Sequence, residues 1–182
     1  MEVSILVVAS LSNRLAGSAL RACPATIRVF APSLRNLLDP HPSFSSLAAQ
    51  FDVVCLNLGE WSACPDQEEI ADRLKLLVVT DGPNGVRIRF LSDGGAHEEL
   101  HAPVYPRSRP PVDTNRAGET LASTFLLALW EGGWKGGAVA RSLIESAARR
   151  ASAAAALQLD LPRFGFPDRN AIEGALRLGR VP

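Results

Sequence analysis

The stretch RPPVDTNRAGETLASTFLLALWEGGW, residues 109–134, joins a proline-rich polar loop to an apolar helix. The helix is expected over residues 117–131, because apolar residues dominate this segment and two glycines follow it. The amides of residues 116–119 point out of its N-terminus with partial positive charge, so this terminus can accept an anion, above all phosphate. Gly118 would let the anion come close, whereas Glu119 is also what an ordinary helix start prefers.

Short apolar runs alternate with helix-forming stretches through the first half of the chain. The runs are β-branched and bounded by polar or turn residues, as is typical of buried strands. They cover residues 4–9, 26–31, 51–57 and 75–80. The segments between them can each form a helix over part of their length, and they cover residues 12–23, 33–50 and 61–74. This order predicts an α/β fold with a mainly parallel sheet and right-handed crossovers.

The pattern changes after Thr80. Turn residues at 81–85 and 92–95 flank a run that alternates like a half-exposed strand, and an extended segment follows over residues 97–106. These features predict an antiparallel hairpin or a small edge sheet. Two further helices are expected after the one at 117–131. They run from about Gly137 to Leu157 and over residues 166–178, the second with Pro167 or Asp168 near its start.

Composition and length indicate one domain over residues 1–182. The chain is 47% hydrophobic, which is enough to bury a core. Nineteen basic residues balance nineteen acidic ones, and no long basic run occurs. Nucleic acid is therefore not expected as a partner, because binding it requires a concentrated basic face.

The apolar N-terminus is expected to be a strand and not a targeting segment. It carries Glu2 where a signal peptide has positive charge, and it is too short to span a membrane, so no membrane partner is expected. Cys23, Cys55 and Cys64 are odd in number and lack C-x-x-C spacing. They indicate three reduced thiols in a cytoplasmic protein.

The sequence HEELH, residues 97–101, matches the H-E-x-x-H pattern of zinc proteases. That chemistry requires both histidines on one face of a helix, but here glycines precede the motif and prolines follow it. On a strand, His97 and His101 would stand about 13 Å apart, too far for one zinc ion. A polar hairpin strand is the better interpretation.

Two polar motifs follow expected strand ends, where ligands bind in open α/β sheets. In NLGE, residues 57–60, Asn57 and Glu60 can orient magnesium-bound water, or Asn57 can cap the next helix. In TDGPNG, residues 80–85, backbone amides can approach a phosphate, or Gly82 and Gly85 can serve a tight turn.

These segments, in this order, resemble the C-terminal half of the pfkB family of carbohydrate kinases, which has the ribokinase-like fold. VDTNRAGETLASTFLLAL resembles the family signature D-T-x-G-A-G-D-x-F, NLGE resembles its N-x-x-E motif, and VVTDGPNGV resembles its T-x-G-x-x-G loop. ASAAAALQL and GFPDRNAIEGAL are similar to the two helices that flank the family's adenine pocket. The resemblance implies a three-layer α/β/α domain, residues 1–182, that binds nucleotide and lacks the family's N-terminal lid and substrate part.

The signature implies roles for the start of the expected helix. By resemblance, Arg116, Ala117 and Gly118 form the anion hole for the transferred phosphoryl group. Glu119 falls on the family's catalytic base. Two residues depart from the pattern, since Arg116 replaces a glycine and Glu119 replaces an aspartate.

The other motifs imply a site for ATP and Mg²⁺. By resemblance, Asn57 and Glu60 organise magnesium and the phosphates, with Glu60 acting on Mg²⁺ through water. The remaining residues implied to contact the nucleotide are Thr80, Gly82, Gly85, Asp113 and Thr114.

The resemblance implies an ATP-dependent phosphotransferase that acts on the hydroxyl of a small sugar-like metabolite. The alternative is a non-catalytic nucleotide- or metabolite-binding protein derived from such a kinase, or a subunit of a larger complex. A homodimer or obligate complex is also expected. Without the family's N-terminal strands a sheet edge is left open, and the run at residues 4–9 is the expected margin.

Overall fold

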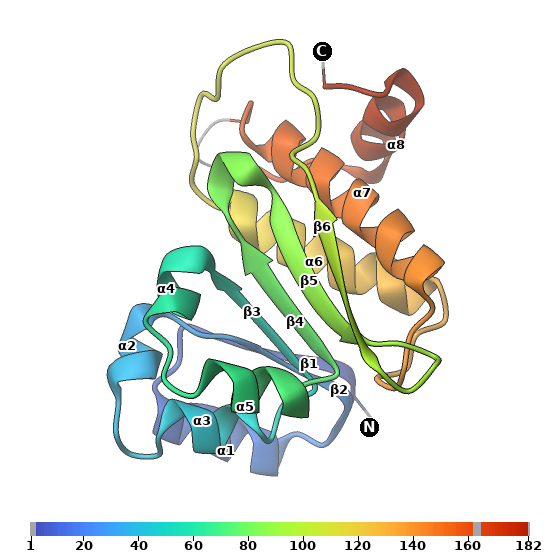
Figure 1. The fold of residues 1–182 in the computed structure, drawn as a ribbon. Coiled ribbons are helices and arrows are strands. Elements are labelled where there is room, and N and C mark those ends of the chain that lie inside the picture. The colour runs from blue at the N-terminus through green and yellow to red at the C-terminus, as the bar shows by residue number, and fades with distance from the viewer. Residues whose placement is uncertain (1–2, 162–164, 182) are drawn as a thin grey trace. The chain divides into compact units, whose positions relative to one another are not determined.

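The computed structural model describes residues 3–161 and 165–181 (Figure 1). The chain divides into two compact units. Unit 1 comprises residues 1–81, 87–100 and 135–139, and unit 2 comprises residues 82–86, 101–134 and 140–182.

A six-stranded sheet has its strands in chain order. The strands are β1 (Val3–Ala9), β2 (Ala25–Ala31), β3 (Val53–Asn57), β4 (Leu76–Thr80), β5 (Val86–Leu91) and β6 (His97–Ala102). The first four are parallel to one another. The connections into β5 and β6 are too short for a parallel crossover, so these two strands form antiparallel hairpins. The mixed sheet confirms the expected α/β fold and the hairpin after Thr80.

Five short helices belong to unit 1. They are α1 (Asn13–Ala22), α2 (Leu34–Leu38), α3 (Phe44–Ala48), α4 (Leu58–Ser62) and α5 (Gln67–Arg73). Two of the expected helical segments are each broken in two, because Pro40 and Pro42 separate α2 from α3 and Pro65 separates α4 from α5. The helix α4 begins three residues before the expected segment at 61–74, because Asn57 caps it.

The unit 1 helices cover one face of the parallel strands (Figure 1). Phe30 of β2 is fully buried there, stacks on Phe51 with ring centroids 4.8 Å apart, and meets Phe44 of α3 at 6.0 Å. Side chains that alternate with this set, such as Val29 and Val53, are buried as well. This explains why the strands are almost continuously apolar in sequence.

Asp52, next to the start of β3, links this strand to the middle of β2 and the start of β4. Its carboxylate accepts hydrogen bonds from the Arg28 backbone N–H at 2.9 Å and from Arg28 Nε and Nη2 at 3.0 Å each. Its carbonyl oxygen accepts the N–H groups of Lys75 and Leu76 at 3.0 and 3.1 Å. The hydrogen bonds that the Arg28 guanidinium donates to the Asp52 carboxylate raise the pKa of Arg28. One residue therefore ties β2, β3 and β4 into a common register.

Unit 2 contains the three long C-terminal helices α6 (Ala117–Glu131), α7 (Arg141–Gln158) and α8 (Arg169–Leu178). The predicted bounds of α6 are confirmed, and Asp168 caps α8 by accepting the Ala171 N–H at 2.8 Å. The prediction that α7 begins near Gly137 is wrong, because the Val139 N–H donates to Leu91 O at 2.9 Å and this pairing keeps the segment extended. None of the described helices is long and apolar enough to cross a membrane.

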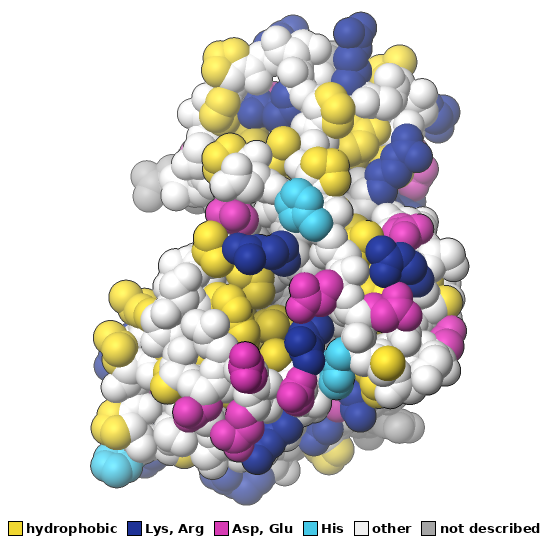
Figure 2. Space-filling model, viewed as in Figure 1, with side chains coloured by type: hydrophobic (Ala, Val, Ile, Leu, Met, Phe, Trp, Pro, Cys, Tyr) yellow, Lys and Arg dark blue, Asp and Glu magenta, His cyan; other side chains and the backbone are white. Residues whose placement is uncertain are grey.

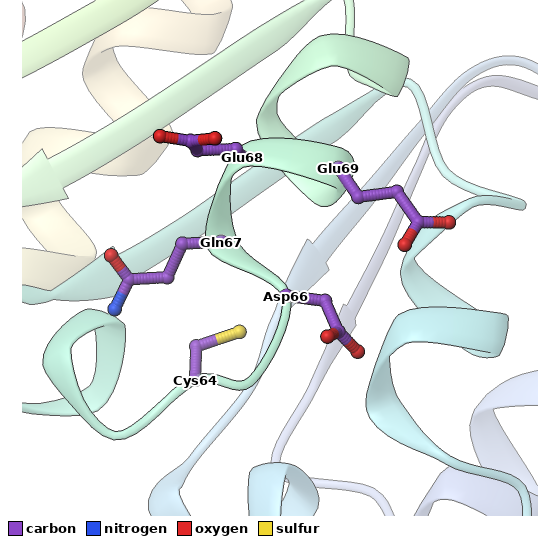
Figure 3. Close-up of a pocket in the computed structure, with 5 residues that line it drawn as sticks. All are labelled: Cys64, Asp66, Gln67, Glu68 and Glu69. Atoms are coloured by element: carbon purple, nitrogen blue, oxygen red, sulfur yellow. The ribbon is translucent and has the colours of Figure 1, made fainter.

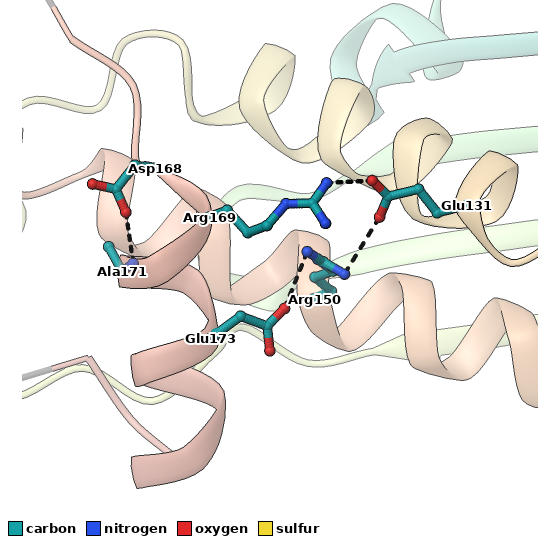
Figure 4. A network of polar contacts seen from close by, with 6 residues as sticks. All are labelled: Glu131, Arg150, Asp168, Arg169, Ala171 and Glu173. Atoms are coloured by element: carbon teal, nitrogen blue, oxygen red, sulfur yellow. Dashed lines mark hydrogen bonds and ion pairs between the residues drawn. The ribbon is translucent and has the colours of Figure 1, made fainter.

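An ion-pair network joins the three helices of unit 2 (Figure 4). Glu131 at the end of α6 pairs with Arg169 of α8 and, at 3.6 Å, with Arg150 of α7. Arg150 also pairs with Glu173 of α8 at 3.0 Å. Charges alternate along the network, so each arginine has a carboxylate partner and α8 is held against α6 and α7.

The buried thiols give a prediction that tests the packing of unit 1. Burial raises the pKa of Cys55 to about 12, and burial together with the charge of Asp66 raises the pKa of Cys64 to about 11. Because the thiolate is the reactive form, a raised pKa slows alkylation at pH 8. Cys23, which is partly exposed, should therefore be alkylated first in the native protein, and all three thiols should react after denaturation. Rapid native labelling of Cys55, followed by mass spectrometry, would contradict this packing.

Candidate functional site

The start of α6 has an unusual backbone. Arg116 precedes the helix with φ 65° and ψ 1°, a left-handed conformation that glycine adopts readily and a β-carbon disfavours. Its carbonyl accepts the Thr120 N–H at 2.9 Å, which closes the first helical turn. The family signature has glycine at this position, so the local geometry is the one that the signature requires. Arginine holds it at a cost of about 1–2 kcal/mol.

The first turn of α6 presents amides and a carboxylate on an open surface. The amides of the first helical residues have no partner within the helix, and the Arg116 side chain makes no capping hydrogen bond to them. Among the described residues, a β-carbon placed on Gly118 would meet nothing within 4 Å, so the surface at Gly118 is open. Glu119 is exposed in the same turn. An anion and a carboxylate with access to solvent can therefore lie side by side at this end of the helix.

The loop that leads to α6 is fixed by hydrogen bonds within unit 2. The N–H groups of Val112 and Asp113 donate to Leu159 O, next to the end of α7, at 2.8 and 3.2 Å. The Asp113 carboxylate in turn accepts the Asn115 N–H at 2.8 Å. These bonds hold Asp113 and Thr114 immediately before the helix start, and they attach this loop to α7.

Phe166 is a site residue that the motif analysis did not single out. The Arg116 guanidinium carbon lies 5.4 Å from the centre of the Phe166 ring, which is 68% exposed. This cation–π contact brings the segment before α8 against the start of α6. The indication in the sequence is the triplet GFP, residues 165–167, directly before the Asp168 cap. Its phenylalanine is exposed, so packing in the core does not explain why an aromatic residue stands there.

Asn57 and Glu60 form a reciprocal capping box at the start of α4. Asn57 Oδ1 accepts the Glu60 N–H, and Glu60 Oε2 accepts the Asn57 N–H, both at 2.9 Å. The capping alternative considered for this motif is therefore realised. It also explains why α4 begins at Leu58. A carboxylate has about four lone-pair positions, so one bond to Asn57 leaves Glu60 able to accept further donors.

Thr80 lies beside this box. The register of β3 with β4 pairs Asn57 with Thr80, and Thr80 Oγ1 donates to Leu56 O at 3.5 Å. The structure thus brings Asn57, Glu60 and Thr80 together within unit 1, at the carboxyl ends of two parallel strands. That edge is where open α/β sheets bind ligands.

Gly82 and Gly85 lie in unit 2, in the turn after β4. Both have positive φ, 51° and 95°. A β-carbon on Gly85 would lie 2.2 Å from Ala102 O, so the turn itself requires glycine there. Gly82 has open space around its Cα and leaves the backbone accessible. The tight-turn alternative therefore explains Gly85 fully and Gly82 in part.

The alanine-rich segment of α7 is part of a core. Ala151, Ala153 and Ala154 are fully buried, and Ala153 and Ala156 pack in a cluster with Tyr105. Small side chains at these positions allow close packing within unit 2. The predicted site residues thus fall into two groups, one in each unit.

The described residues contain no group of three or more His, Cys, Asp or Glu side chains that could hold a metal ion. The strand interpretation of HEELH is confirmed, since both histidines lie on β6. The His97 ring contacts Leu74 O at 3.0 Å, and the His101 ring contacts Asn84 O at 2.8 Å.

A surface pocket in unit 1 is lined by none of the predicted site residues (Figure 3). Its lining residues are Cys64, Asp66, Gln67, Glu68 and Glu69. Acidic side chains gather on this face over α5 (Figure 2). Gln67 donates to Trp61 O at 2.7 Å, and the raised pKa of Cys64 keeps the thiol protonated. The pocket has the composition of a solvated acidic surface.

A sequence profile of the pfkB family of carbohydrate kinases matches residues 2–164. Comparison with curated protein sequences gives no match. The structure is similar to a nucleoside kinase from Burkholderia thailandensis in complex with inosine, with TM-score 0.73, 20% identity, and 98% of this chain aligned to 57% of that one.

Two further solved structures have the same fold. Ribokinase from Thermotoga maritima gives TM-score 0.68 and 20% identity, covering 96% of this chain and 57% of that one. Aminoimidazole riboside kinase from Salmonella enterica, complexed with aminoimidazole riboside and an ATP analog, gives 0.72 and 17%, covering 96% and 64%. The chain thus spans less than two thirds of the length of these relatives. The profile match over most of the chain, with the signature at the start of α6, shows that it belongs to the pfkB family of carbohydrate kinases.

Proposed function

We propose that this protein is an ATP-dependent phosphotransferase that acts on a hydroxyl group of a small sugar-like metabolite, a free sugar or a nucleoside. The observation that carries the proposal is the start of α6. A left-handed residue, an open Gly118 and an exposed carboxylate at 119 coincide there with the family signature. The related kinases support the substrate class, since one is bound to inosine and another to aminoimidazole riboside and an ATP analog.

The proposed chemistry uses few groups. The acceptor hydroxyl gives its proton to the Glu119 carboxylate while its oxygen forms a bond to the γ-phosphorus of ATP. The bond from that phosphorus to the bridging oxygen breaks, and ADP leaves with the electron pair. The open amides at the start of α6 accept the negative charge of the transferred group, and Arg116 adds a positive charge beside them. Positioning accounts for most of the catalysis in such reactions.

Proposed nucleotide contacts occur in each unit. Glu60 would act on Mg²⁺ through water, with Asn57 and Thr80 beside it, and the ion would neutralise phosphate charge. The proposed nucleotide contacts in unit 2 are Gly82, Gly85, Asp113 and Thr114. The donor set fits, because magnesium in kinases keeps several waters and uses one or two carboxylates plus the substrate phosphates.

A second candidate is a nucleotide-binding protein without transferase activity. It is favoured by two departures from the family signature, Arg116 in place of glycine and Glu119 in place of aspartate. Both fall where the transferred phosphoryl group would be held, and phosphoryl transfer depends on positioning. Turnover measurements decide between the two candidates.

The first prediction concerns nucleotide binding. ATP with Mg²⁺ at about 100 times its dissociation constant should stabilise the protein by about 2.7 kcal/mol, a rise of roughly 5–10 °C in the melting temperature. Glu60→Gln should leave the stability of the free protein within about 0.5 kcal/mol, because glutamine also completes a capping box. It should abolish the part of the rise that depends on Mg²⁺.

Thermal denaturation with ATP alone and with ATP and Mg²⁺ measures both effects. Glu69→Gln is the matched control, since it removes one exposed carboxylate from α5 and should leave the nucleotide response unchanged. No rise with any adenine nucleotide would remove the basis of both candidate functions. A Glu60→Gln response equal to that of the parent would rule out the metal role of Glu60.

The second prediction concerns the base. In a coupled assay with a panel of sugars and nucleosides, Glu119→Gln should lower turnover by about a hundred- to ten-thousandfold and leave the ATP-induced rise in melting temperature unchanged. Glu119→Asp should retain activity, because the carboxylate and the helix start are both kept. An active parent whose turnover survives Glu119→Gln would exclude this role. A parent that binds ATP but transfers no phosphate to any acceptor would support the second candidate.

The third prediction tests the backbone at Arg116. Arg116→Gly and Arg116→Ala remove the same side chain and its contacts, and they differ only in tolerance of positive φ. The glycine variant should be more stable by about 1 kcal/mol, measured by urea denaturation. The order should reverse if the backbone at this position had an ordinary negative φ, because alanine would then lose less entropy on folding.

A further inference from the structure

Arg116 adds a side chain at the start of α6 where the family signature has glycine. Its guanidinium carbon lies 5.4 Å from the centre of the Phe166 ring, within the range of a cation–π interaction. Arg116 is partly buried, although Asn115 before it and Gly118 after it are exposed. The guanidinium therefore has a defined place beside the helix start, and the Phe166 ring contributes to it.

The backbone that carries Phe166 is fixed by the start of α8. Pro167 restricts the residue before it, which is Phe166, to extended conformations. Asp168 then caps α8 by accepting the Ala171 N–H at 2.8 Å (Figure 4). The aromatic ring therefore belongs to a short segment whose conformation is set by a proline and a helix cap.

The helix α8 is itself held within unit 2. Arg169, its first residue, forms an ion pair with Glu131 at the end of α6 (Figure 4). In its second half, the carbonyl of the buried Ala175 accepts a hydrogen bond from Tyr105 Oη at 2.9 Å. Contacts in both halves of α8 therefore fix the helix that follows Phe166, and with it the position of the aromatic ring.

We propose that Phe166 is a positioning residue that holds the Arg116 guanidinium for binding to the γ-phosphate of ATP, an inference that rests on the proposed function. A long side chain loses rotamer freedom when it binds a phosphate oxygen, and one already held against a ring loses less. The ring attracts the cation through its π face, so arginine N–H groups can still reach phosphate oxygens. Because ADP lacks the γ-phosphate, the pair of residues favours ATP over ADP.

The test measures the dissociation constants of ATP and ADP, each with Mg²⁺, by titration calorimetry of the full chain. Phe166→Leu keeps an apolar side chain but removes the π face. It should weaken ATP binding by about two- to fivefold, the range of exposed cation–π contacts, and leave ADP binding unchanged. Phe166→Tyr keeps the π face and should bind ATP like the parent. The matched control is Leu178→Ala, which removes another exposed apolar side chain of unit 2 and should change neither constant.

A double-mutant cycle shows whether the ring acts through the guanidinium. Arg116→Gly should weaken ATP binding more than ADP binding, and in that background Phe166→Leu should have no further effect. Equal weakening of ATP and ADP by Phe166→Leu would overturn the inference. So would an unchanged affinity for ATP, or a loss that persists without the arginine. A parent that binds neither nucleotide would overturn the proposed function, and this inference with it.

Discussion

The position of the nucleotide motifs depends on how Asp52 is bonded. Its carboxylate holds Arg28 of β2, and its carbonyl holds the first residues of β4. Because parallel strands advance together from a common start, fixing the register at Asp52 also fixes it at the other end. There Asn57 faces Thr80, and the capping box of α4 begins. A partly exposed ion pair thus helps to determine which side chains meet at the carboxyl ends of these strands.

Much of this fold follows from the sequence because local and tertiary preferences agree. The bounds of α6 and β5 were predicted correctly, since a strongly apolar segment or an alternating strand ended at clear turn residues. The helical segments around Pro40, Pro42 and Pro65 were harder, because apolar periodicity continued across residues that break a helix. The start of α7 could not be predicted from its own residues, because a strand far away in sequence holds Val139.

The candidate site shows why motifs alone leave roles open. The spacing N-x-x-E places the glutamate where it can reach back to the asparagine amide, and the same spacing places it beside the strand end where the proposed magnesium would lie. Composition cannot separate these roles, whereas the hydrogen bonds show that the first is present. The signature at the start of α6 was more informative. Its glycine position implies a left-handed residue, and Arg116 adopts that conformation although arginine is poorly suited to it.

The composition of β6 has a consequence for its margin of the sheet. The strand lies at the end of the sheet order, and its sequence HEELHA carries two glutamates and two histidines in six residues. Charged side chains on an edge strand disfavour the addition of another strand. The side chains of β6 therefore protect this margin against aggregation by backbone pairing.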